Sequence, residues 1–397
     1  MESVRKNLRR CDWRRAIIYL LTCYLIFNTS MPAVLAAPSG GVFTYPVTDP
    51  GTIVQGVPDS VVTVNQKESI IEWGSPGSGG INTVAGESLT FLQAEGLSNS
   101  AVLNRIMSGN ETSFGGILNG LDMRIFIVNP AGIVFGAGSR VNVAQLVASG
   151  IGMSNEAFLN AVTDPMQDMV FDQGGEGIVH HYKGRIEAQS VYLVGKQVIN
   201  GGEIIAKPGG LVVMAAGDSV YLAQDGSSVL VEVSGPGGTT ADVQNRSMIS
   251  VPDGTIVLAA GDTFSRAILN VGILSARGGT VTAQAASIVN SGKIGVEANP
   301  AMDGDGGSVT LTGIDEVILN PYPYKSIVAN AGLKGEGGDI TITSGGTVTV
   351  NDGTIVEARG GSVSDNGGTV KISCEDFILA GGVDGKPAID ASPVNNS

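Results

Sequence analysis

Residues 337–350 read GGDITITSGGTVTV, two short segments in which Ile or Val alternates with Thr and which each follow a pair of glycines. Alternation at every second position is typical of a β-strand, because successive side chains of a strand point to opposite faces. Similar segments stand at 279–283, 307–312 and 368–373. Glycine pairs recur at 278–279, 306–307, 337–338 and 367–368, in steps of 28, 31 and 30 residues.

A fixed repeat of this kind indicates a solenoid, in which each repeat packs against its neighbours. Strands of four to six residues with glycine at the corners predict an all-β chain folded as a right-handed parallel β-helix. We expect aliphatic ladders at the inward positions. The alternative is an antiparallel sandwich or barrel, whose hairpins use pairs such as Asn119-Gly120 and Asp253-Gly254. The regular recurrence of one unit favours stacked coils.

Composition excludes several classes of protein. Glycine accounts for 58 of 397 residues, about twice the usual share, but no Gly-X-Y period marks a collagen. Hydrophobic residues make up 43%, enough to bury a core. The net charge is -14, and the first 36 residues hold six basic and two acidic residues, which leaves 17 basic and 35 acidic residues and a net of -18. So acidic a chain disfavours nucleic acid and anionic membranes as partners.

The start of the chain predicts a secretory signal peptide, residues 1–36. Basic residues precede an apolar run of 12 at 16–27, and Val34-Leu35-Ala36 places small or apolar residues before a cut between Ala36 and Ala37. The run is too short for a transmembrane anchor, which takes about 20 residues. Cys11 and Cys23 leave with the leader, so the mature chain keeps only Cys374 and can form no internal disulfide.

Two stretches depart from the strand pattern. Ser154 is placed to cap a helical turn that runs to Val162, and 163–178 is irregular and predicts a loop outside the solenoid. The spacing at 102–107 fits either a helix or a strand.

No residues predict a catalytic, cofactor or metal site. His180 and His181 are neighbours that we expect to be exposed in the loop, and on a strand they would face opposite ways. The segment 303–307, DGDGG, lacks the Glu that closes an EF-hand loop, although a lone calcium-binding β-roll turn stays open. Enzymes on β-helices need two or three Asp, or Asp with Lys and Arg, converging on one outer face. The acidic residues here are scattered at turns, and no cluster mixes Asp with Arg and Lys at coil spacing. We therefore expect a protein that is not an enzyme.

One motif stands apart from the repeats. Residues 123–149 read MRIFIVNPAGIVFGAGSRVNVAQLVAS, a strand, a tight turn at Asn129-Pro130-Ala131-Gly132, and a strand that resumes at Ile133. Asn bonds back to the backbone, Pro fixes φ, and Gly accepts a dihedral that other residues avoid. From spacing alone, this is one more corner of the solenoid.

The motif resembles the signature of the N-terminal secretion domain of filamentous haemagglutinin-type exoproteins, the TpsA partners of two-partner secretion. That signature, Asn-Pro-Asn-Gly-Ile followed by Val or Ile, Phe and Gly, stands here at 129–136, and its later strand stands at 141–149 as VNVAQLVAS. Residues 70–73, 89–91 and 102–105 resemble segments upstream of it, and 202–206 and 209–222 resemble strands downstream. Ala131 replaces the second Asn, and the family's Asn-Pro-Asn-Leu motif is absent.

The resemblance implies a secreted exoprotein of the adhesin type. Its partners would be the Sec machinery and an outer-membrane TpsB-type transporter, whose POTRA domains meet the chain in the periplasm. The chain would fold outside as a β-helix with an N-terminal cap and small antiparallel elements, and would stay extracellular or on the outer-membrane surface. Asn129, Pro130, Gly132 and Ile133 would serve in transporter recognition or as a template turn. The alternative that they only shape a corner stays open, and the adhesive ligand is not predicted.

Two other functions stay open, a β-helical polysaccharide lyase or hydrolase and a haem or haem-protein binding exoprotein. We expect the secretion domain at 37–225 and continuing β-helix repeats at 226–397. The last residues carry no obvious cap, so we expect either a short family member or a truncated chain.

Overall fold

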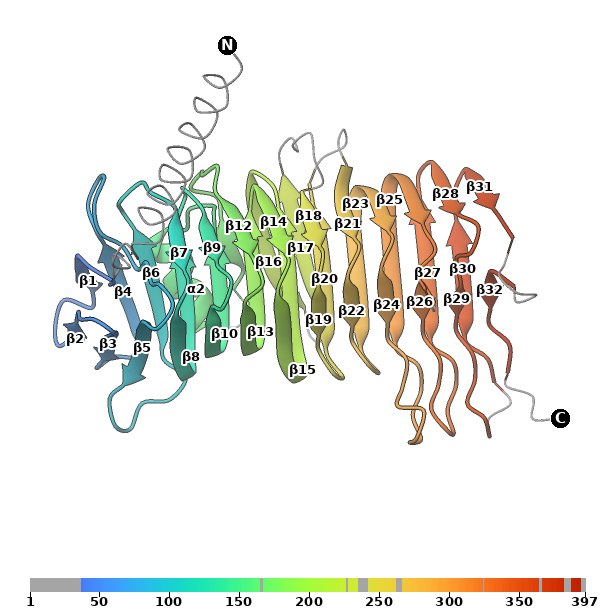
Figure 1. Ribbon diagram of the computed structural model, residues 1–397, viewed down its shortest axis with the longest axis horizontal. Helices are drawn as coiled ribbons and strands as arrows, with labels where there is room; N and C mark the ends of the chain where they lie inside the picture. Colours follow the sequence, from blue (N-terminus) through green and yellow to red (C-terminus); the bar gives the residue numbers. More distant parts are fainter. Residues whose placement is uncertain are drawn as a thin grey trace, which may run out of the picture. The chain divides into compact units, whose positions relative to one another are not determined.

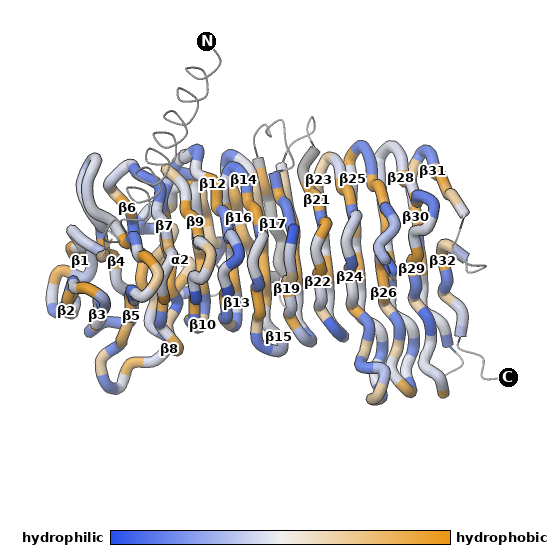
Figure 2. The backbone as a smooth tube through the Cα atoms, viewed as in Figure 1, coloured by the Kyte–Doolittle hydropathy of each residue, from blue (hydrophilic) through white to orange (hydrophobic). Residues whose placement is uncertain are grey.

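The computed structural model describes residues 37–164, 167–225, 228–234, 242–261, 266–323, 325–363, 366–381 and 387–393. The predicted leader, including Ala36, therefore lies outside the described residues. Strands dominate the described part, which contains one helix. Successive coils stand side by side (Figure 1), and hydrophobic residues recur along them coil after coil (Figure 2).

The β-helix has three faces of mutually parallel strands, here called faces A, B and C. Face A contains β3 (Asp59–Val64), β5 (Ser88–Gln93), the first parts of β8 (Ile117–Val128), β10 (Arg140–Ser149), β13 (Arg185–Gly195) and β15 (Glu203–Ala216), then β19 (Met248–Ser250), β22 (Ile273–Ser275), β24 (Lys293–Gly295), β26 (Ile327–Val328), β29 (Val356–Glu357) and β32 (Ile389–Asp390).

The other two faces continue the same coils. Face B contains β4 (Glu68–Trp73), β6 (Ala101–Ile106), the second parts of β8, β10, β13 and β15, then β20 (Thr255–Ala260), the first parts of β23 (Thr280–Asn290) and β25 (Ser308–Leu319), β27 (Asp339–Ser344) and β30 (Thr369–Ser373). Face C contains β7 (Thr112–Phe114), β9 (Ile133–Phe135), β12 (Ile178–His181), β14 (Gln197–Asn200), β18 (Val243–Asn245), β21 (Arg266–Asn270), the second parts of β23 and β25, β28 (Thr347–Val350) and β31 (Asp376–Leu379).

This arrangement confirms the predicted parallel β-helix. Inward side chains form ladders, because each residue pairs with its counterpart one coil on. On face A one such column runs through Leu118, Val141, Ile186, Ile204 and Ile249, all buried. Burial of aliphatic side chains yields about 25 cal/mol per Å² of apolar surface, so the core stabilises the stack. The segment at 102–107, which the sequence left ambiguous, lies mostly in strand β6.

The predicted cap and antiparallel elements are also present. β1 (Gly41–Tyr45) pairs antiparallel with β4, and β2 (Gly51–Val54) pairs antiparallel with β3. β11 (Met169–Phe171), β16 (Ser219–Asp225) and β17 (Ser228–Ser234) form a separate antiparallel sheet. The predicted loop at 163–178 therefore contains strand β11 and the start of β12, so the prediction was wrong for those residues. Residues of β11 form a strand because they pair with β16, which lies far along the chain and could not be foreseen from the local pattern.

A second hydrophobic cluster covers the outer side of face B. Helix α2 (Asn155–Thr163) begins where predicted, with the Ser154 hydroxyl accepting from the Ala157 N–H. The Phe158 ring meets Phe126 of β8 edge to face, with centroids 5.1 Å apart. Phe171 of β11 is buried in the same cluster. Face B strands near α2 are therefore buried on both sides, which explains why β8 and β10 end in continuous apolar runs.

Candidate functional site

The turn at Asn129–Gly132 joins β8 to β9, at the corner between faces B and C. The Gly132 N–H donates to the Asn129 carbonyl at 2.9 Å, which closes the predicted tight turn. The chain then continues at Ile133, which pairs with Thr112 of the preceding coil and with Val179 of the following coil. The turn therefore sits between two other coils and not at an edge of the stack.

The Asn129 side chain links the turn to the preceding coil. It is 1% exposed, and its amide nitrogen donates to the Asn110 carbonyl at 2.8 Å and to the Thr112 hydroxyl at 2.9 Å. Its amide oxygen accepts from the Ala131 N–H at 3.0 Å. Both amide protons are thus used between coils, while the oxygen holds the turn itself. An aspartate would lose both donors, which explains why this corner uses Asn.

Glycine is required at the end of the turn. Gly132 has φ +109°, a conformation that L side chains rarely adopt. A Cβ there would lie 3.1 Å from the Ile178 carbonyl oxygen of the next coil. Ile133, the next residue, is fully buried in the core. Glycine is therefore needed both for the backbone dihedral and for the close approach of two coils.

Only the tip of the turn reaches solvent. Pro130 and Ala131 are exposed, whereas Asn129, Gly132 and Ile133 are buried. The two tip residues border a groove of about 500 Å³, whose lining includes Met107 and Met153. Met107 is 42% exposed. In the folded chain a partner could contact the tip and this groove, but it could reach Asn129 and Ile133 only before the coil closes.

The two histidines differ from the sequence-based expectation of an exposed loop pair. Both lie on β12, and His181 is fully buried on the inward side, where its ring meets Phe135 at 6.3 Å between centroids. Burial lowers the pKa of His181 to about 4, although a hydrogen bond with Asn200 opposes the shift. Burial, followed by the charge of Arg246, lowers the pKa of the outward-facing His180. The expectation was wrong because the strand pattern at 178–181 is too short to recognise.

His181 begins a ladder of buried asparagines on face C, which the sequence analysis missed. Its Nδ1 lies 2.8 Å from the Asn200 oxygen, and the amides then hydrogen-bond in series from coil to coil. The steps Asn200 to Asn245, Asn245 to Asn270 and Asn270 to Asn290 measure 2.9, 2.9 and 2.7 Å. The sequence did carry a signal for this ladder, because four successive strands of face C each end in Asn, at 200, 245, 270 and 290. The signal was hidden because loops of different length separate these residues in the sequence.

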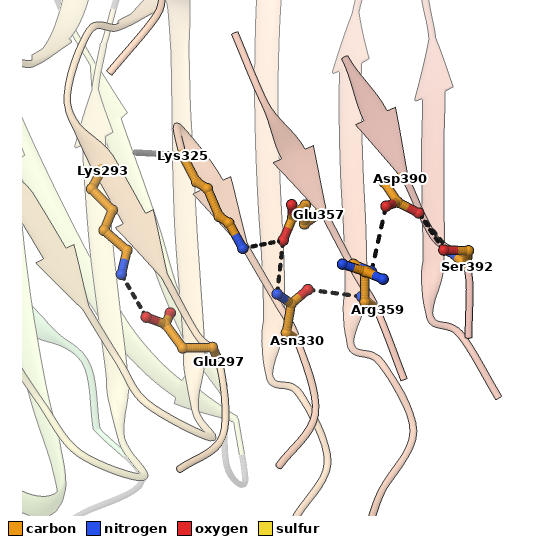
Figure 3. Close-up of polar contacts among 8 residues, drawn as sticks. All are labelled: Lys293, Glu297, Lys325, Asn330, Glu357, Arg359, Asp390 and Ser392. Carbon is orange, nitrogen blue, oxygen red and sulfur yellow. Dashed lines mark hydrogen bonds and ion pairs between the residues drawn. The ribbon is translucent and has the colours of Figure 1, made fainter. Parts of the chain in front are cut away.

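A charged cluster on face A, which includes Asp390 beside Arg359, corrects a second expectation, that no cluster mixes Asp with Arg and Lys at coil spacing. Lys293, Lys325 and Arg359 stand on one outer surface with carboxylate partners (Figure 3). The sequence analysis missed this cluster because its members lie on successive coils. One coil contains about 30 residues, so these side chains are far apart in the sequence.

Other candidates give no site among the residues that the structure describes. No group of three or more His, Cys, Asp or Glu could hold a metal ion there, including the 303–307 segment. Cys374 is half-buried and not in a disulfide. No helix of the described part has the length and hydrophobicity to cross a membrane.

Comparisons with known proteins agree with this geometry. The model of the family described as the TPS secretion domain matches residues 58–310. The crystal structure of the HMW1 secretion domain from Haemophilus influenzae aligns with a TM-score of 0.61 at 20% identity, over 90% of this chain and 98% of that one. The filamentous hemagglutinin secretion domain aligns with a TM-score of 0.50 at 15% identity, over 84% of this chain and 100% of that one. Both share the fold.

A curated relative is similar in sequence over a shorter stretch. The heme/hemopexin-binding protein of Haemophilus influenzae is 29% identical over 161 residues, which cover 39% of this chain. The matched stretch spans only 17% of that relative's own length.

Proposed function

The chain belongs to the TPS secretion domain family, and from this premise we propose that it is exported through a dedicated outer-membrane TpsB-type barrel and folds outside the cell. The leader, residues 1–36, would direct it through the Sec machinery to the periplasm. POTRA domains of the barrel would meet it there. The family match over 58–310 carries this proposal, and the inter-coil turn at Asn129 supports it.

The stacking of the coils supports folding during export. Each described coil pairs in parallel with the coil before it, so a coil that has left the pore finds a ready sheet edge on its predecessor. Folding in this order needs an early coil that is held firmly. The cap strands β1 and β2 cover that end, since they pair antiparallel with β4 and β3.

The buried side chains at the turn favour a template role over recognition of the folded turn. The Asn129 amide nitrogen donates both of its hydrogen bonds to the preceding coil, and the Ile133 side chain is buried in the core. A partner that contacts the folded chain would reach Pro130 but not these two residues. Gly132 lets the coils approach. We assign Asn129, Gly132 and Ile133 to the closure of an early coil and Pro130 to the exposed tip, where a transporter would make contact.

The test compares secretion of variants in cells that carry the partner barrel. Asn129→Ala lowers the amount in the medium several-fold, because the early coil closes poorly. Pro130→Ala distinguishes recognition from the template role. If this variant is as stable as the wild type but less of it is exported, the transporter contacts the tip of the turn. If it is exported normally, the turn acts only as a template. Export of Asn129→Ala at the wild-type level contradicts the template role.

The function after export is proposed as surface binding of the adhesin type, without catalysis. The heme/hemopexin-binding relative favours haem or a haem protein as a second candidate ligand. Of the two histidines of the chain, His181 is buried and bonded to Asn200, so His180 is the one available to a ligand. Titration of the purified chain with haemin tests this candidate: a Soret shift that is lost in His180→Ala supports it.

The domain boundary also stays a prediction. We propose that 37–225 suffices for export and that 226–397 is the exported continuation. The family match runs across residue 225, so truncations after residues 225 and 310 distinguish a short from a long export unit.

A further inference from the structure

The outer layer over face B encloses a pocket, here called the Arg124 pocket, with a volume of about 340 Å³. Its floor is the outer side of β8, β10 and β13, and its walls come from α2, β11 and β16. The polar part of its lining includes Lys67, Arg124, Gln145, Ser190 and Tyr192. A hollow of this size is at the lower end of the range for ligand sites, so it suits a ligand of about one ring.

Three polar side chains stand in one row across the coils on the floor of the pocket. Arg124 of β8 pairs with Gln145 of β10, and Gln145 pairs with Ser190 of β13. Phe126 and Tyr192 follow two residues later on β8 and β13, so they point to the same outer side. The floor therefore offers a row of polar groups beside two aromatic rings.

The Arg124 guanidinium has no carboxylate partner among the described residues. Its Nε donates to the Asn99 carbonyl and its Nη1 donates to the Val162 carbonyl, each at 3.2 Å. Both acceptors are neutral, and a guanidinium has five N–H donors, so several stay free. Burial lowers the pKa of Arg124, and the charge of Glu68 opposes this shift only in part. The positive charge is therefore held in the pocket without being neutralised there.

Lys67 is the second cation of the lining, and none of the described lining residues is an Asp or Glu. Lys67 is exposed and forms no ion pair within the described part of the chain. The charged cluster of Lys293, Lys325 and Arg359 on face A differs, because each of its cations is paired with a carboxylate. The Arg124 pocket thus keeps a positive charge that an anion can meet.

The Tyr192 hydroxyl is an independent feature that points to a ligand. The side chain is only 7% exposed, and burial raises its pKa to about 12, so the hydroxyl keeps its proton. It forms no hydrogen bond with any described residue, and the same holds for the side chains of Gln145 and Ser190. Buried polar groups normally have partners. Hydroxyl groups of a bound molecule would supply partners for these three side chains.

The acidity of the chain limits the ligand to a small charge. Glu68, which acts on Arg124, lies two coils before it in the same column and outside the lining. Charges further away than about 8 Å are largely screened at physiological salt. A ligand with one charge therefore responds mainly to Arg124 and Lys67, whereas a polyanion would place further charges against the acidic surface. The pocket favours a monoanion.

A single sugar acid has the chemistry that this pocket asks for. Its carboxylate accepts two parallel hydrogen bonds from a guanidinium. Its hydroxyl groups donate and accept, as the side chains of Gln145, Ser190 and Tyr192 do. We propose that the Arg124 pocket binds one sugar acid, with the carboxylate at Arg124 and the hydroxyl groups along the floor.

This proposal goes beyond export. The described lining of the Arg124 pocket shares no residue with the groove at the Asn129 turn. Binding is measured on the purified chain, so a failure of this proposal would leave the export proposal untouched.

The experiment measures binding of glucuronate to the purified chain by calorimetry. The methyl ester of glucuronate is the neutral probe, and acetate is the anion without hydroxyl groups. Glucuronate should bind, and both probes should bind at least about tenfold more weakly. An oligosaccharide that ends in glucuronic acid distinguishes two sources of the ligand. If it binds like the monomer, the pocket takes the end of a glycan, and if only the monomer binds, the pocket takes a free sugar acid.

Two variants separate binding from a structural role. Arg124→Gln should weaken binding about tenfold or more, because it removes the charge that meets the carboxylate. It should also destabilise the end of α2, since Arg124 bonds to the Val162 carbonyl. Tyr192→Phe removes a hydroxyl that has no described partner, so it should weaken binding several-fold without lowering the stability of the chain. A merely structural role would not produce that combination.

Arg185→Gln is the matched control. It removes the same charge from face A, where Arg185 pairs with Glu187 and Glu203. This variant should bind glucuronate like the wild type. The proposal is overturned by absence of glucuronate binding, by equal binding of the ester or of acetate, or by equal losses in Arg185→Gln and Arg124→Gln. Binding at the wild-type level in both Arg124→Gln and Tyr192→Phe would also overturn it.

Discussion

Single residues at the Asn129 turn and at the start of the asparagine ladder decide how neighbouring coils fit together. The sequence predicted the turn itself, because Asn, Pro and Gly each have a local preference that needs no knowledge of the fold. It could not predict that the Asn129 amide would reach Asn110 and Thr112. Such a contact depends on the register between coils, which no local pattern records.

Replacement of Asn129 by alanine should destabilise the early coils. The change removes hydrogen bonds to Asn110 and Thr112 and one to Ala131, at about 1 kcal/mol each, so we expect a loss of roughly 2 to 3 kcal/mol. Amide hydrogen exchange at 110–112 and 131–133 measures this loss of stability at the two coils that the Asn129 side chain joins.

Ala131→Asn is the control for this change. The side chain at 131 is exposed, and restoring the second Asn of the family signature should alter stability by less than about 0.5 kcal/mol. Unchanged exchange in Asn129→Ala, or a large effect of Ala131→Asn, contradicts the assignment.

Stability should depend on the charge of His181 in acid. The pKa of this residue is about 4 in the folded chain and about 6.5 when unfolded. Between these values the unfolded state binds the proton and the folded state does not, so stability falls as the pH drops from 6.5 towards 4. The loss approaches roughly 3 kcal/mol at pH 4.

Urea unfolding at several pH values checks this prediction. His181→Asn, which extends the ladder by one amide, should remove this part of the pH dependence. His180→Gln should leave most of it, because His180 is outward-facing. If the free energy of unfolding depends on pH in the same way in the wild type and in His181→Asn, the prediction is wrong.

At the scale of elements, the strands of faces A and B show what periodicity can and cannot predict. The alternation of apolar and polar residues identified strands wherever they exceed about four residues, as at 308–312 and 339–343. Two- and three-residue strands such as β24 and β26 carry too few positions to show a period. The register between coils could not be read from the sequence either, so only the structure revealed the asparagine ladder and the charged cluster of Lys293, Lys325 and Arg359.

The middle of the asparagine ladder should matter more than its end. Asn245→Leu leaves the Asn200 donor and the Asn270 acceptor buried without their partner, at about 1 to 3 kcal/mol for each group. Within the ladder, Asn290→Leu leaves only the Asn270 donor without its partner, although it also removes the bond from Asn290 to the Gly292 carbonyl. The next residue in its column is already Leu319. The free energy of unfolding should therefore fall further for Asn245→Leu, and equal losses would show that the amides are not coupled along the ladder.

At the scale of the whole molecule, one parallel β-helix with a capped start and an outer layer accounts for the described residues. Repeats and composition predicted this architecture, because a glycine-cornered unit that recurs has few other ways to bury its apolar face. The family signature predicted the route of export. The charged cluster on the outer side of face A was not predicted, since outward residues are free of the constraints that shape a core.

The leader prediction is tested on the secreted protein. If the cut falls between Ala36 and Ala37, then N-terminal sequencing of the protein from the medium should begin at Ala37. A start inside the strands of the cap would contradict the prediction, because cleavage there would remove partners of β3 and β4.

Export through a partner is the central claim, and the most direct measurement is the amount of this chain in the medium with and without the TpsB-type barrel. The account predicts that the chain reaches the medium only when the barrel is present and that it stays in the periplasm otherwise. Equal amounts in the medium of both strains would contradict it.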